Sequence, residues 1–247
     1  MKTISVLLAL AAFFFADLAL AGAVATSVTG TVGVQTGTAG PRVLRQGDQV
    51  NQGDTVFTGG ASSVVLRFDD GQIAALTSNS RMQVTSYQYN RPARSGNVLL
   101  SLISGGMRAI TGLLGHANPN QVSYRAATAT IGIRGTDVNI TVGDNIVAAS
   151  VNEGSITFTF NGTTVVVPTG QGAIGANGQI TPGASRDVFN RLPANLQNLF
   201  GDLNTFTTKI NDALSQAGRE GNESGTNTTP SNGTSPGSTG GGNASAR

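Results

Sequence analysis

Apolar and polar residues alternate in short runs along most of the chain, and glycine-containing turns separate these runs. Residues 64–69 read Val-Val-Leu-Arg-Phe-Asp, so every second side chain is apolar, as in a strand with one buried face. The Asp70-Gly71 pair that follows is typical of a tight hairpin turn, because glycine accepts the positive φ that the turn requires. The apolar run at 73–76 therefore predicts the next strand of a hairpin.

The same pattern predicts strands over the rest of residues 24–183. Before residue 135 the further candidate strands lie at 24–34, 42–50, 53–58, 82–89, 121–124 and 129–133. The run 98–103 fits either a buried strand or a short helix that ends at Gly105-Gly106. After residue 135, glycine turns divide paired runs at 138–142 and 146–151, 155–160 and 163–167, and 173–174 and 179–180. Many short strands with such turns indicate an all-β sandwich, a barrel or a short solenoid.

The period of the apolar pattern changes after residue 183. Apolar residues then recur in steps of three and four, at Leu192, Leu196, Leu199, Leu203, Phe206, Ile210 and Leu214. This spacing predicts one amphipathic helix over residues 185–216, with Pro193 in its first turn. Two roles are open for its apolar stripe: packing on the β-domain, or binding a partner or a second copy of the chain.

The two ends of the chain differ in composition from the rest. Residues 1–23 have the basic residue, apolar run and small residues of a secretory signal, and cleavage is equally consistent with the Ala19-Leu20-Ala21 and Ala21-Gly22-Ala23 sites. Residues 218–247 are rich in Gly, Ser, Asn and Thr and are predicted to be disordered. These features predict a protein that is exported to the periplasm or secreted, without a membrane span in its mature form.

Composition limits the chemistry that the chain can perform. It contains no cysteine, which excludes disulfides and thiolate metal sites, and no tryptophan. Charged residues make up 11% of the sequence, and the net charge is +2. The basic residues occur singly along the sequence, so a groove that follows nucleic-acid phosphates is not expected.

No group of residues forms a recognisable catalytic or metal-binding motif. Asp69 and Asp70 are adjacent, but we expect one to cap the Asp-Gly turn and the other to be solvated. His116, the single histidine, has no recognisable catalytic partner in the sequence around it. Oxygen ligands for calcium exist, but without a known loop pattern; they are Asp54, Asp69, Asp70, Asp137, Asp144 and Glu153. We therefore predict no enzyme activity, cofactor or metal site.

Four motifs occur in an order that resembles the FecR domain, over residues 30 to 182. The first runs from Gly53-Asp54 through Thr58-Gly59 to Asp70-Gly71. It is followed by Arg134-Gly135-Thr136-Asp137, by Glu153-Gly154 and by Gly170-Gln171. The resemblance implies two facing twisted sheets and a module of bacterial cell-envelope regulators and secreted proteins. In the best-known regulators a cytoplasmic segment and a membrane span precede the domain, an arrangement that this sequence does not show.

The sequence therefore predicts an exported, non-enzymatic interaction module that binds an envelope protein and is associated with signalling. One alternative is a secreted matrix or surface protein that assembles through the helix stripe. A weaker alternative is a polysaccharide-binding module, for which Tyr87 and Tyr89 are the candidate platform. We expect Arg134 to be structural, with several hydrogen bonds to turn carbonyls or to a carboxylate, so that its loss lowers the melting temperature.

Overall fold

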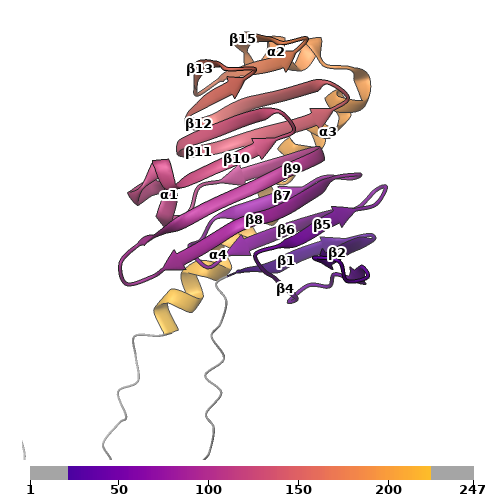
Figure 1. The fold of residues 1–247 in the computed structure, drawn as a ribbon. Helices are drawn as coiled ribbons and strands as arrows, with labels where there is room; N and C mark the ends of the chain where they lie inside the picture. The colour runs from indigo at the N-terminus through magenta and orange to yellow at the C-terminus, as the bar shows by residue number, and fades with distance from the viewer. Residues whose placement is uncertain (1–21, 224–247) are drawn as a thin grey trace, which may run out of the picture.

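The protein is mostly β, and all of its strands belong to one mixed sheet (Figure 1). The computed structural model describes residues 22–223, and their side chains up to residue 215. The strands are β1 (Ala23–Thr29), β2 (Val32–Thr36), β3 (Arg42–Val43), β4 (Gln49–Val50), β5 (Asp54–Thr58), β6 (Ser63–Phe68), β7 (Ile73–Leu76), β8 (Arg81–Asn90), β9 (Ser95–Ile110), β10 (Val122–Ala126), β11 (Ala129–Gly143), β12 (Ile146–Phe160), β13 (Thr163–Pro168), β14 (Gln171–Ala176) and β15 (Gln179–Ala184). The all-β fold expected from the sequence is thus confirmed.

The sheet forms two facing layers because three long strands pass from one layer to the other. Residues 95–104 of β9 pair with β8 and β10, whereas residues 105–110 pair with β7 and β11. β11 and β12 pair with each other along their length, but the second partner of each strand changes. β11 pairs with β10 before residues 135–136 and with β9 after them, and β12 pairs with β14 before residues 152–154 and with β13 after them. The two sheets expected from the family resemblance are therefore the two layers of one continuous sheet.

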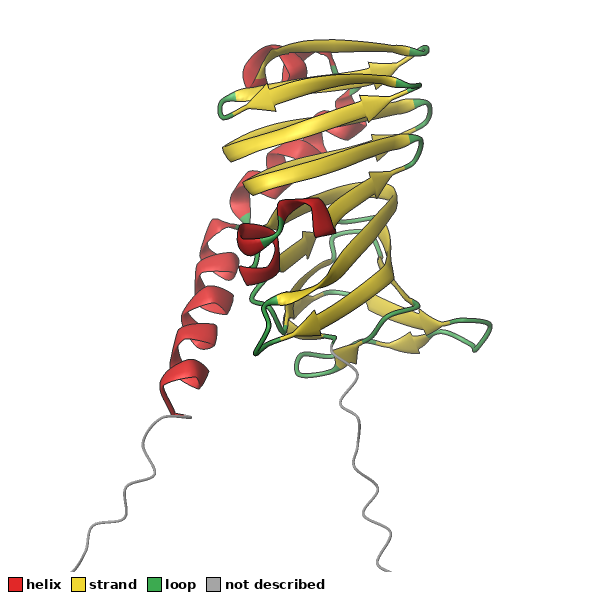
Figure 2. Ribbon diagram, turned by 60° about the vertical axis from the view of Figure 1, so that its left-hand side comes forward, coloured by secondary structure: helices red, strands yellow, loops and turns green. Residues whose placement is uncertain are grey.

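We name the layers by what lies on their outer faces. The open layer contains β2, β3, β5, β8, β10 and β13, with the first parts of β9 and β11 and the last part of β12. The helix-covered layer contains β1, β4, β6, β7, β14 and β15, with the remaining parts of those long strands. Figure 2 shows the stacked strands with helices along one side.

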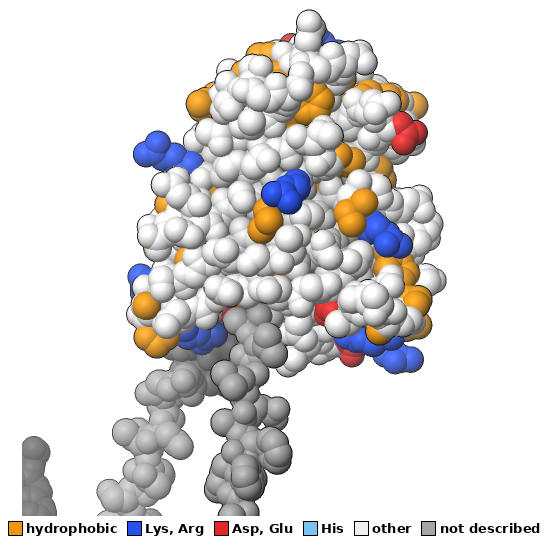
Figure 3. Space-filling view, viewed as in Figure 1, with side chains coloured by type: hydrophobic (Ala, Val, Ile, Leu, Met, Phe, Trp, Pro, Cys, Tyr) orange, Lys and Arg blue, Asp and Glu red, His pale blue; other side chains and the backbone are white. Residues whose placement is uncertain are grey.

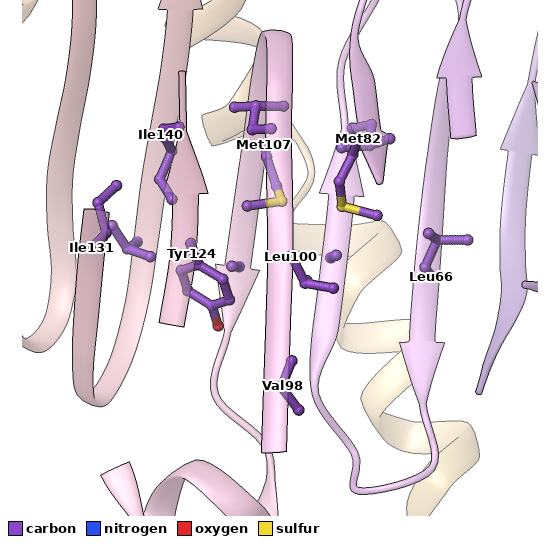
Figure 4. Packing of buried hydrophobic residues seen from close by; sticks show 14 of the residues in the cluster. Leu66, Met82, Val98, Leu100, Met107, Tyr124, Ile131 and Ile140 are labelled. Carbon is purple, nitrogen blue, oxygen red and sulfur yellow. The ribbon is translucent and has the colours of Figure 1, made fainter. Parts of the chain in front are cut away.

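The main hydrophobic core lies between the two layers. Met82, Leu100 and Ile131 of the open layer and Leu66, Met107 and Ile140 of the helix-covered layer are all buried in one cluster (Figure 4). Inward-facing residues alternate with outward-facing ones along each strand, as the sequence pattern predicted.

Three helices, rather than the single predicted one, follow the sheet. They are α2 (Ser185–Arg191), α3 (Ala194–Thr205) and α4 (Thr207–Glu223). Leu192, which precedes Pro193, has the extended ψ of 148° that a proline favours in the residue before it, so the helix is interrupted there. α4 continues past residue 218, the predicted start of the tail. The short α1 (Leu113–Ala117) and 3-10 helix η1 (Pro119–Gln121) connect β9 to β10.

The apolar stripe of the C-terminal segment packs against the helix-covered layer. Leu203, Phe206 and Ile210 form a buried cluster with residues of β6 and β7, and Leu192 and Leu196 lie in a second cluster with residues of β12 and β14. Leu199 is half-buried at the second cluster, and Leu214 remains 38% exposed. The stripe therefore has the packing role, the first of the two considered.

The predicted signal (1–23) and tail (218–247) are only partly described. Residues 1–21 and 224–247 lie outside the described residues, and β1 already includes Ala23. In the part of the chain that is described, no helix is both long and apolar enough to span a membrane.

Candidate binding face and the motif residues

Two of the family motifs form the corner where β11 and β12 pass between the layers. Gly135 and Gly154 have φ angles of +58° and +80°, which favour glycine over residues with a side chain. A Cβ atom on Gly154 would lie 2.0 Å from the carbonyl oxygen of Gly135. The two motifs thus allow two bent strands to pack backbone against backbone. Beside them, Thr136 N–H donates to Thr111 Oγ1 at 2.9 Å.

The first family motif also builds turns and a corner. Asp54 Oδ2 accepts a hydrogen bond from Asn51 N–H at 2.9 Å, which closes the turn containing Gly53. Thr58 Oγ1 donates to Thr77 O at 2.5 Å and accepts from Ser80 N–H at 2.9 Å. Gly59 N–H donates to Thr31 O at 2.9 Å. These motif residues therefore fix the connections between the layers.

The closing Gly170-Gln171 motif performs a similar task on β14. Gly170 N–H donates to Val151 O at 2.8 Å, and Ser185 N–H donates to Gly170 O at 3.0 Å. Gln171 opens β14 with an exposed side chain, and Glu153 is exposed beside Gly154. The closing motif thus fixes the connection from β13 to β14.

The structure corrects the role expected for Arg134. Its side chain is exposed and makes no hydrogen bond or ion pair with any described residue. Arg108 instead holds the motif carboxylate, with Nε 2.9 Å from Asp137 Oδ1 and Nη2 2.6 Å from Asp137 Oδ2. Such a two-point ion pair fixes both side chains. Arg134 is therefore available to a ligand, whereas Arg108 is structural.

Asp70 caps the Asp-Gly turn, as expected, but does so from a fully buried position. Its Oδ1 accepts hydrogen bonds from Gln72 N–H at 3.2 Å and from the Tyr87 hydroxyl at 3.1 Å. Burial raises the pKa of the Asp70 carboxyl above its ordinary value of 3.8, and these hydrogen bonds oppose that shift only in part. Burial and then the charge of Asp70 raise the pKa of Tyr87.

Replacing Asp70 by Asn is expected to change how stability depends on pH. Because the pKa is raised in the folded protein, the unfolded chain ionises first as pH rises above about 4, and the free energy of unfolding falls through that window. Asn cannot ionise, so Asp70→Asn avoids this fall in stability. Its melting temperature should therefore rise relative to that of the wild type as the pH increases from about 3 to about 7. Thermal melts of both proteins measure the difference. The exposed turn residue Asp144 supplies the control, Asp144→Asn. If the difference in melting temperature between Asp70→Asn and the wild type does not change with pH, the raised pKa of Asp70 is contradicted.

The remaining candidates for chemistry do not come together. Asp69 is exposed and accepts a hydrogen bond from Gly22 N–H, whereas Asp54 bonds Thr36 and Asp137 bonds Arg108. Across residues 22–223 no three His, Asp or Glu side chains are placed to share a metal ion. His116 lies in α1, with Nδ1 3.5 Å from the position of a Cβ on Gly135.

The proposed tyrosine platform for sugars is not present on the surface. Tyr87 is 3% exposed and stacks on Phe68 with 4.9 Å between ring centroids. Tyr89 packs against the core, and its hydroxyl is buried. The structure thus overturns the expectation that these rings offer their faces to a ligand.

The strand segments from β8 to β13 of the open layer carry arginines but no acidic residues on the outer face. Five exposed arginines lie on it or at its border: Arg81, Arg91, Arg94, Arg125 and Arg134. The strand segments that form it from β8 to β13 contain no Asp or Glu. Figure 3 shows this face, with blue side chains spread over it and the few red ones toward its right and lower margins. We call this surface the arginine face.

A groove of about 610 Å³ lies on the arginine face between η1 and β13. Pro119 and Asn120 line it from η1 and Val166 from β13, whereas Gly132 and Thr157 belong to the strands between them. A Cβ on Gly132 would lie 2.5 Å from Thr157 Oγ1, so glycine keeps this part of the groove open. Arg134 is the one charged residue among those lining the groove.

Two arginines are aligned along the strands that form the groove. Arg125 of β10 pairs with Thr130 of β11, and Arg134 lies four residues further along β11, about 13 Å away along the strand. Strand pairing therefore brings five arginines that are separate in the sequence to one face. The signal that could have revealed this is the absence of any Asp or Glu from residue 71 to residue 136.

Comparison with known proteins supports the family expected from the motifs. Residues 54–157 match the family model described as FecR protein, so the resemblance to this family is confirmed over those residues. Two crystal structures, at 2.50 and 1.65 Å, of a candidate anti-sigma factor from Parabacteroides distasonis ATCC 8503 align with a TM-score of 0.44 and 15% identity. The alignment covers 53% of this chain and 59% of that protein, which is less than two thirds of its length. No curated protein matches the sequence.

Proposed function

We propose that this FecR-domain protein is an exported, non-enzymatic regulatory module that binds an acidic segment of an envelope protein involved in signalling. The arginine face is the observation that carries the proposal. This face has five exposed arginines and contains the groove. Its strand segments from β8 to β13 contain no Asp or Glu. Such a surface attracts a partner of opposite charge and orients it as it approaches.

The free edge of β13 favours a protein partner over a polysaccharide or a nucleic acid. β13 pairs with β12 on one side, and no described strand pairs with its other side. An extended peptide can add to such an edge through main-chain hydrogen bonds. Val166, 70% exposed on β13, lines the groove, so one peptide could contact both the strand and Arg134. The proline of β13, Pro168, is its last residue, whereas Pro182 lies inside β15 and obstructs strand addition there.

Site-specific photo-crosslinking in intact cells tests this function. A photoreactive residue at Val166 should capture one envelope protein, identified by mass spectrometry. The same residue at Val43, which is 58% exposed on β3 at the other end of the open layer, should not capture it. Equal capture from both positions would contradict the proposed site.

Charge reversal tests whether the arginines select the partner. Arg125→Glu with Arg134→Glu should reduce capture about tenfold or more, the equivalent of about 1.4 kcal/mol. Arg186→Glu with Arg191→Glu makes the same change in net charge on the exposed side of α2 and should leave capture intact.

In a separate variant, Arg134→Ala should weaken capture while shifting the melting temperature by no more than about 2 °C, because an exposed substitution changes stability little. Unchanged capture by both arginine variants would overturn the role of this face.

The alternative of self-assembly through the helix stripe has less support. Most of the stripe is buried against the helix-covered layer, and Leu214 alone of its seven residues is classed as exposed. A second copy would have to displace packing that already exists.

A further inference from the structure

We infer that the chain is processed between Ala21 and Gly22, and that the new amino group of Gly22 pairs with the carboxylate of Asp69. This inference rests on the export that is part of the proposed function. The sequence alone allows cleavage after Ala21 or after Ala23, because both sites fit the small-residue rule. The structure distinguishes the two, since the first residues of β1 are part of the fold.

Gly22 and Asp69 are joined by two hydrogen bonds. Gly22 N–H donates to Asp69 Oδ2 at 2.8 Å, and Asp69 N–H donates to Gly22 O at 3.1 Å. Gly22 is buried, although Asp69, at the end of β6, is exposed. The turn after β6 therefore already presents a carboxylate at the nitrogen that cleavage after Ala21 would release.

Cleavage after Ala23 would remove residues that the fold uses. Ala23 is 2% exposed and pairs with both Phe68 of β6 and Val50 of β4. Its loss would shorten β1 at the point where it joins two other strands, and would leave Asp69 without Gly22. Cleavage after Ala21 keeps all of these contacts.

The reaction is the hydrolysis of one peptide bond by a signal peptidase, before the chain folds. Water supplies the hydroxyl that joins the Ala21 carbonyl carbon and the hydrogen that joins the Gly22 nitrogen. The released amine then takes up a proton from solvent and becomes an ammonium group. Before cleavage the Gly22 amide already donates to a carboxylate, and cleavage adds a positive charge on the donor. The attraction between the two opposite charges then strengthens the bond to Asp69.

The first test is the amino terminus of the protein isolated from the cell envelope or medium, measured by intact mass and terminal sequencing. A chain that begins at Gly22 is the expected result. A chain that begins at Val24, or at any other processed residue, would overturn the inference while leaving export intact. A chain that keeps Met1 would overturn export itself and the inference with it.

The second test asks whether Asp69 recognises the charge. A removable tag placed before Gly22 gives one protein in which Gly22 N is an amide, and its removal gives another in which Gly22 is the first residue. Asp69→Asn should lower the melting temperature more in the cleaved protein than in the tagged one, because only the cleaved protein places a positive charge beside this carboxylate. Asp144→Asn, in an exposed turn, should have the same effect in both forms. Equal effects of Asp69→Asn in the two forms would overturn the ion pair.

Discussion

Replacing Gly154 by Ala should lower the melting temperature by about 6–12 °C, which corresponds to about 3 kcal/mol in a protein of this size. Two costs add at this position. A non-glycine residue at φ +80° costs about 1–2 kcal/mol. The new Cβ would also lie 2.0 Å from Gly135 O, so one of the two bent strands must move. Thermal melts followed by circular dichroism measure the effect.

Gly170→Ala provides the matched control for this prediction. Gly170 also lies in a connection between the layers and has a φ of +77°, but an added Cβ meets no atom within 4 Å. This variant should lose only the conformational cost of about 1–2 kcal/mol. Equal losses in the two variants would show that the contact between Gly154 and Gly135 adds nothing to the φ cost.

The sequence predicts where the strands lie, but it does not predict which neighbouring runs join into one long strand. The alternating runs at 138–142 and 155–160 are strands, but the runs on either side of Gly135 and Gly154 belong to single bent strands. A glycine with positive φ serves equally in a hairpin turn and in a corner between layers. The difference depends on which strand the next run pairs with, and local sequence does not contain that information.

The contacts of the side chains in the candidate site also depend on strand pairing, which the local sequence does not reveal. Asp137 was recognised as part of a motif, but its partner Arg108 is 29 residues away and comes beside it through the pairing of β9 with β11. The sequence predicts a structural role for Arg134, because a single arginine at the end of an apolar strand commonly bonds turn carbonyls or a carboxylate. Here the two glycines make the corner by backbone packing alone, and the arginine is left on the surface.

Leu203→Ala should destabilise the protein by about 2–5 kcal/mol, because it removes a large side chain from a site with no exposed area. Leu203 lies between α3 and the helix-covered layer, in a cluster with Val65, Ile73 and Phe206. The melting temperature, measured as for Gly154→Ala, should therefore fall by roughly 4 °C at the least.

Leu214→Ala is the control for Leu203→Ala, and dilution of the wild-type protein separates the two roles considered for the stripe. Leu214 is 38% exposed on α4, so its loss should cost about 1 kcal/mol or less. If the stripe packs within one chain, Leu203→Ala lowers the melting temperature, and dilution of the wild-type protein does not. If the stripe joined two copies, dilution would lower the melting temperature of the wild type, since stability would then depend on protein concentration. A melting temperature that rises with protein concentration would therefore favour self-assembly over packing within one chain.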